Sequence, residues 1–120
     1  MQKKLPRSDI AEILCQWRDG NMTAEQTHDW AEDMHMRVEL DDWEDGEEHS
    51  VANEVLAALD MLDMNLILPE DIPIYLRFLN TPMGRFAEGY SEFQDALERI
   101  DYTARQKALA TIPIYARFCR

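Results

Sequence analysis

Four side chains capable of metal binding or acid–base chemistry recur at about one-turn intervals in the first third of the sequence. They are His28, Glu32, His35 and Glu39. An advance of ~100° per residue places all four within about 60° of one another on a helix. Glu32-x-x-His35 matches half of a carboxylate-bridged di-metal motif, but that motif needs a second such pair and further glutamates from other helices, whereas Glu25-x-x-His28 precedes it on the same predicted helix. Because the four lie opposite Trp30 and Met34, the pattern favours a solvated face over a partner-contact surface, and either of these over a metal site.

A dense acidic run follows, with seven acidic residues among the ten from Glu39 to Glu48. Repulsion between neighbouring carboxylates disfavours a continuous helix, so we expect a solvated loop or a frayed helix end. The run resembles the start of a calcium loop at Asp41. However, position three of that loop is Trp43 and position twelve is Ala52, which cannot supply a bidentate carboxylate. Calcium binding is therefore disfavoured.

Trp43 lies in the middle of this run and has two interpretations. Tryptophan is enriched among binding anchors, so it can contact a partner, or it can fold back onto the core. On the first interpretation the acids supply charge and the indole supplies apolar area. The candidate partner-binding residues are Glu39, Asp41, Asp42, Trp43, Glu44, Asp45, Glu47 and Glu48.

The sequence offers no positive sign of catalysis. Four scattered glycines do not form a phosphate-binding loop, and no serine or cysteine lies in a known nucleophile context. Cys15 and Cys119 are far apart and outside any CxxC pair, which favours free thiols in a reducing cytoplasm over a disulfide. We therefore expect neither an enzyme nor a bound cofactor or metal.

Charge is distributed unevenly along the 120 residues. The net charge is −12, and residues 1–60 hold sixteen acids against five bases, whereas residues 61–120 hold eight against seven. One negatively charged face would repel nucleic acid and anionic membranes and attract basic proteins, although solubility alone also explains acidity. No signal peptide or membrane span is evident, so we expect a cytoplasmic protein of one domain, residues 1–120.

Apolar residues recur at helical spacing, and no segment alternates in the manner of a strand. The pattern predicts an all-α bundle of about five to six helices. Helix starts are indicated by a Thr23/Gln26 capping box, by Ser50, by Pro69, and by Asp101 or Thr103. The apolar faces include 10–17, 27–38, 51–62, 72–79 and 86–100, followed by an inward-facing Leu109 and Ile112.

A short sequence repeat, which we call the echo, occurs in two proline-containing segments. Residues 72–78 read IPIYLRF and residues 112–118 read IPIYARF, but the flanking sequences do not match. A tandem-repeat solenoid is therefore disfavoured. We interpret the two segments as similar helical pieces that are started or kinked by proline.

Three further motifs occur in a consistent order along the chain. They are Trp17-Arg18-Asp19-Gly20 followed by Thr23-Ala24-Glu25, then Trp30-Ala31-Glu32, and then Leu68-Pro69-Glu70-Asp71-Ile72-Pro73 leading to Phe78-Leu79. In these the chain resembles the small acidic helical immunity proteins that bacteria make beside toxins, including the colicin D immunity type and those of contact-dependent inhibition systems. The resemblance implies a helical bundle whose acidic surface covers the basic active site of a toxin, often a nuclease. The alternative is an acidic helical adaptor or regulatory domain that binds another basic protein.

Overall fold

The computed structural model describes residues 6–37 and 50–119, and these form helices and no strands. The all-α prediction is confirmed. The described part holds seven α-helices, one more than the upper estimate, because Pro113 starts a separate one-turn helix near the end of the chain. The helices are α1 (Arg7–Arg18), α2 (Ala24–Arg37), α3 (Val51–Asp60), α4 (Ile72–Leu79), α5 (Phe86–Glu98), α6 (Tyr102–Leu109) and α7 (Pro113–Ala116), with a 3₁₀ turn η2 (Pro69–Asp71) before α4.

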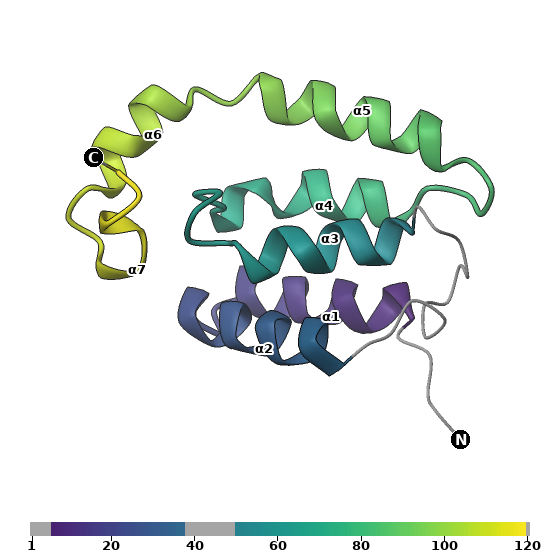
Figure 1. The fold of residues 1–120 in the computed structure, drawn as a ribbon, viewed down its shortest axis with the longest axis horizontal. Coiled ribbons are helices and arrows are strands. Elements are labelled where there is room, and N and C mark those ends of the chain that lie inside the picture. The colour runs from purple at the N-terminus through teal and green to yellow at the C-terminus, as the bar shows by residue number, and fades with distance from the viewer. Residues whose placement is uncertain (1–5, 38–49, 120) are drawn as a thin grey trace.

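The helices stack in tiers, with α6 and α7 closing one end (Figure 1). α1 and α2 form one tier, α3 and α4 the middle tier, and α5 covers α4 from the other side. The core between them includes Ile10 and Leu14 of α1, Leu56 and Leu59 of α3, and Ile72 of α4, all fully buried. Within the described ranges every helix is too short or too polar to reach across a bilayer.

Most of the predicted helix starts are confirmed by hydrogen bonds. Thr23 and Gln26 form the reciprocal capping box at α2, with distances of 2.9 and 3.1 Å. Ser50 Oγ accepts from the Asn53 N–H at 3.1 Å at α3. Asp101, not Thr103, caps α6, accepting from the Ala104 N–H at 3.0 Å.

The start predicted at Pro69 is one turn too early for α4. Pro69 opens the η2 turn, and the Asp71 side chain accepts from the Leu68 N–H at 2.9 Å. α4 begins at the next residue, Ile72, with Pro73 in its first turn. Both proline segments of the echo are thus helix starts, as predicted, at α4 and α7.

Aromatic rings join α5 to α4. Phe93 of α5 stacks on Phe78 with ring centroids 4.4 Å apart, and it meets the edge of Tyr75 at 5.1 Å. Phe86 and Tyr90 extend this contact along α5. Such pairs contribute about 0.5–1.5 kcal/mol each beyond the area they bury. The predicted stripe on the fifth helix is therefore the surface that packs on α4.

The C-terminal arm, residues 101–119, is held by polar contacts to the segment between α3 and α4. Arg105 forms a two-pronged ion pair with Asp71, at 2.6 and 3.0 Å, and donates to the Leu66 carbonyl at 3.2 Å. Burial alone would lower the pKa of Arg105, but the hydrogen bond and charge of Asp71 outweigh it, so the pKa is raised. Tyr115 adds a hydrogen bond from its hydroxyl to the Ile67 carbonyl at 2.6 Å.

The prediction that Ile112 faces inward is wrong. Ile112 is exposed, whereas Leu109 is buried as expected. The prediction assumed that one helix continues through Ile112. In the structure the helix ends before it, and Ile112 precedes Pro113 and serves as the N-cap of α7. Tyr115 takes the buried position in this part of the arm.

We predict that Arg105→Ala lowers the free energy of unfolding by about 3–5 kcal/mol, because it leaves the Asp71 carboxylate buried without its charge partner. Denaturant unfolding followed by circular dichroism measures the change. Arg85→Ala is the matched control, since Arg85 pairs with Glu88 on the surface and its loss should cost less than about 1 kcal/mol. Equal effects from the two variants would contradict the role given to Arg105.

Gly89 lies inside α5, where helix propensity alone treats it as a weakness of about 1 kcal/mol. The structure gives it a steric role, because a Cβ at this position would lie 2.2 Å from Thr81 Oγ1 and 2.9 Å from Thr81 Cβ. Thr81 is buried in the turn between α4 and α5. The glycine lets α5 return closely along α4.

We therefore predict that Gly89→Ala destabilises the protein by about 1–3 kcal/mol, although alanine is the better helix former. Ser91→Ala, at an exposed position of the same helix, should be neutral or slightly stabilising. Thermal unfolding compares the two. Combining Gly89→Ala with Thr81→Ala should recover part of the loss, and an unchanged or raised stability of Gly89→Ala itself would refute the steric explanation.

Candidate functional site

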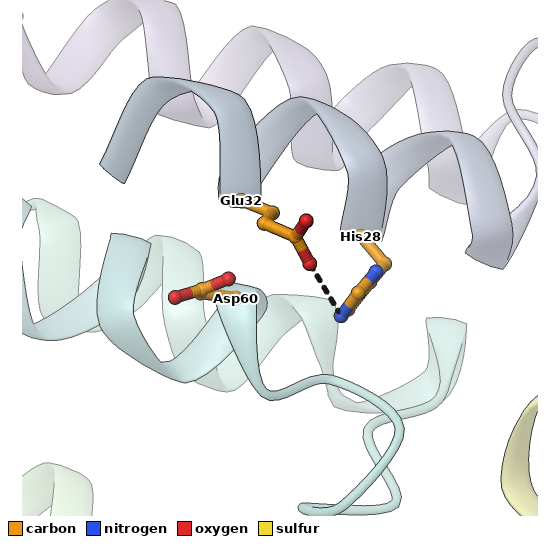
Figure 2. Close-up of side chains that lie close together, drawn as sticks. All are labelled: His28, Glu32 and Asp60. Carbon is orange, nitrogen blue, oxygen red and sulfur yellow. Dashed lines mark ion pairs between the residues drawn. The ribbon is translucent and has the colours of Figure 1, made fainter. Parts of the chain in front are cut away.

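Histidines of α2 meet carboxylates at the end of α3. Figure 2 shows His28 and Glu32 of α2 pointing toward Asp60 of α3, and one nitrogen or oxygen atom from each of the three lies within 4.8 Å of the others. His28 Nε2 is 3.9 Å from a Glu32 oxygen and 3.8 Å from Asp63 Oδ1. We call this group the His28 cluster. It consists of His28, Glu32, His35, Asp60 and Asp63.

The cluster corrects the expectation that the histidine stripe is a solvated face. The side chains of His28 and His35 are only 18% and 37% exposed, because α2 packs against α3 at the stripe's edge. The residue buried at the centre of this contact is Ala31, which lies about 60° from His28 and about 40° from His35 around the helix. The stripe is indeed opposite Trp30, but Trp30 is half-buried and does not mark the centre of the buried face.

Hydrogen bonds hold the carboxylates of the cluster in place. His35 Nδ1 lies 2.8 Å from Asp60 Oδ2. Asp63, 14% exposed, accepts from the Met64 N–H at 2.8 Å and pairs at 3.6 Å with Arg117, the residue after α7. Only Glu32 extends into solvent. The cluster therefore has hydrogen-bonded groups on its inner side and one exposed carboxylate, Glu32, on its outer side.

The cluster is suited to binding a cation or to sharing a proton. Three carboxylates and two imidazoles meet there, which is the donor set of many metal sites and acid–base pairs. Within 6–37 and 50–119, no hydroxyl or thiol side chain hydrogen-bonds to either histidine. The described geometry thus lacks a pairing of nucleophile with base.

The predicted partner-binding residues fall outside the described part of the chain. This applies to the whole set of Glu39, Asp41, Asp42, Trp43, Glu44, Asp45, Glu47 and Glu48. The structure does describe α2, the helix that precedes these residues in the sequence. Asp29 and Asp33 on α2 are exposed, Asp29 to 81%, and Asp33 pairs with Arg37 at 3.1 Å.

A second feature escaped the sequence reasoning. A groove of about 510 Å³ lies between the end of α3, α5 and the C-terminal arm. Its apolar lining includes Met61, Met64, Leu97, Tyr102 and Phe118. Met61 and Met64 are exposed, and their three-residue spacing just after α3 was the sequence signal that could have indicated an apolar surface. The grouping with α5 and the arm needed the tertiary structure.

Comparison of the chain with protein-family models, with curated proteins and with solved structures finds no significant match.

We predict a coupling free energy of about 1 kcal/mol between His35 and Asp60 in a double-mutant cycle with alanine at both positions, because the two share a half-buried hydrogen bond. Urea unfolding of the four proteins measures it. The matched cycle pairs His35 with Asp33, which bonds to Arg37 instead, and should give a coupling near zero. Equal couplings would mean that the His35–Asp60 contact does not contribute to stability.

Proposed function

We propose that this protein binds a cationic protein through an acidic surface formed by α2 and the segment that follows it. The observation that carries the proposal is the concentration of charge. Residues 24–49 contain eleven acids and one base, a net charge of −10 out of −12 for the whole chain. Acidic residues spread evenly along the chain would serve solubility equally well, so their concentration in residues 24–49 favours a binding role.

The described half of this surface has the rigidity that such a role needs. α2 is fixed at its start by the Thr23/Gln26 capping box and along its length by the burial of Thr27 and Ala31. The helix backbone thus fixes the spacing of its exposed acids, which lowers the ordering cost of binding. Exposed charges at the rim of a protein–protein interface mainly raise the association rate and its dependence on salt concentration.

Taken with the sequence resemblance, this supports an immunity protein that neutralises a toxin made by the same bacterium. A nuclease presents lysines and arginines to the phosphates of its substrate. An array of carboxylates on a folded protein can occupy the same positions and compete with RNA or DNA directly. On this proposal Trp43 is the apolar anchor within the acidic run.

An acidic adaptor is the second candidate, and the methionine-lined groove is the observation that favours it. Methionine side chains adapt to varied apolar partners, and a groove of this kind suits the apolar face of a helix. In that case the groove, not the acidic run, would contribute most of the affinity.

The test measures binding of the purified chain to the protein encoded by the adjacent gene, together with rescue of cells that express that protein. We predict that changing Asp41, Asp42, Glu44 and Asp45 to lysine weakens binding by about 100-fold or more, because attraction becomes repulsion. Calorimetry gives the affinity. Circular dichroism should show unchanged helicity.

The control carries the same change in net charge on α5, with lysine at Glu88, Glu92, Asp95 and Glu98, which are all exposed. It should bind almost as the unmodified chain does. An equal loss of affinity in both variants would mean that only the net charge of the protein matters for binding. Unchanged affinity in the first variant would reject the assigned surface, and a partner released by Met61→Asp and Met64→Asp instead would favour the adaptor.

A further inference from the structure

We propose that His28, Glu32 and Asp60 form a binding site for a divalent transition-metal ion of the Zn²⁺ type, which links α2 to α3. This inference is independent of the toxin-binding proposal. It rests on the spacing of donor atoms, on the groups that orient them and on the charge gathered there.

The donor atoms have the spacing of metal ligands more than that of hydrogen-bond partners. His28 Nε2 lies 3.8 and 3.9 Å from the oxygens of Asp63 and Glu32, beyond hydrogen-bonding distance. Zinc bonds of ~2.0–2.1 Å at tetrahedral angles separate neighbouring ligand atoms by about 3.3 Å. The exposed Glu32 side chain would have to move inward by about 0.6 Å, and the Asp60 oxygen, which lies within 4.8 Å of the other two ligand atoms, by up to about 1.5 Å.

Groups next to the ligands hold two of them in a binding orientation. His28 Nδ1 lies 3.5 Å from Asp29 Oδ1, so a proton on Nδ1 would face that carboxylate while Nε2 lies on the Glu32 side. His35 lies 2.8 Å from one oxygen of Asp60, which fixes that carboxylate on the α3 side. Partners of this kind orient ligands in metal sites and affect affinity by about 10–100-fold.

The charge balance of the site also favours a cation. Glu32, Asp60 and Asp63 bring three carboxylates around one imidazole, and Asp63 is itself largely buried. Arg117 offsets part of this charge from outside, at 3.6 Å from Asp63. A divalent ion would offset two negative charges directly, with Asp63 beside the three ligands.

The donor set selects the class of metal. One imidazole with two or three carboxylates is a mixed nitrogen and oxygen site that suits Zn²⁺ or Co²⁺. Ca²⁺ takes six to eight oxygen ligands, and Mg²⁺ prefers an octahedron that is largely water and oxygen. The site therefore binds neither of these two ions well.

The experiment titrates the full chain, freed of metal by a chelator, with Zn²⁺ and separately with Co²⁺. We expect one ion per chain by calorimetry, visible d–d absorption of Co²⁺ in a tetrahedral site, and a thermal midpoint raised by several degrees. His28→Ala and Glu32→Gln should each weaken Zn²⁺ binding by at least about tenfold. Glu32 is exposed, so its variant tests the site even where His28→Ala unfolds the protein.

Asp33→Asn is the matched control, because it removes one carboxylate from the same helix outside the cluster. It should keep the affinity and stoichiometry of the unmodified chain, as should lysine replacements at Asp41, Asp42, Glu44 and Asp45. Three results would overturn the proposal. They are no binding of either ion, equal binding by Glu32→Gln and Asp33→Asn, and loss of binding only in the variant of the acidic run.

Discussion

The arrangement of this protein depends on the close packing of α2 against α3 through small side chains. Only Thr27 and Ala31 of α2 are fully buried, while Trp30 and Met34 are partly buried against the core. Because Thr27 and Ala31 are small, the helices approach closely, and residues at the edge of the contact meet across it. The pairing of His35 with Asp60 follows from that approach, and so does the outward direction of Asp29 and Asp33. One packing contact thus positions both the His28 cluster and the exposed acids of α2.

Features set by neighbouring residues could be read from the sequence. The capping box at Thr23, the cap at Ser50 and the proline starts of α4 and α7 depend on contacts within a few residues, and the structure confirms them. The apolar stripes of α1, α3 and α5 were likewise visible from period alone, since α1 and α3 each bury several large side chains and α5 packs its aromatic stripe on α4.

Features set by contacts between distant segments could not be read in this way. The stripe at His28 was placed in solvent because Trp30 looked like the centre of the buried face, and only packing shows that the centre is Ala31. Gly89 looked like a weak point in a helix until Thr81 was found beside it. The groove at Met61 combines parts of the chain that are remote in sequence. In each case the information lies in a neighbour that periodicity does not identify.

The two halves of the chain neutralise their carboxylates differently. In the second half, Glu70, Asp71 and Glu88 pair with arginines, whose charge is permanent. Around α2, Glu32 and Asp60 face histidines, whose charge depends on protonation. The negative potential around Glu32 and Asp60 is therefore adjustable, although Asp33 on the same helix pairs with the permanent charge of Arg37.

The contact between Arg117 and Asp63 gives the end of the chain an influence on this adjustable side. Arg117 belongs to the arm that Arg105 and Tyr115 clamp to the segment after α3. Its guanidinium brings a positive charge from the last few residues to the edge of the seam between α2 and α3. A partner or a chemical modification that draws this side chain away would deepen the negative potential around His28 without touching α2. A positive charge from a distant part of the sequence thus contributes to the electrostatic potential beside α2.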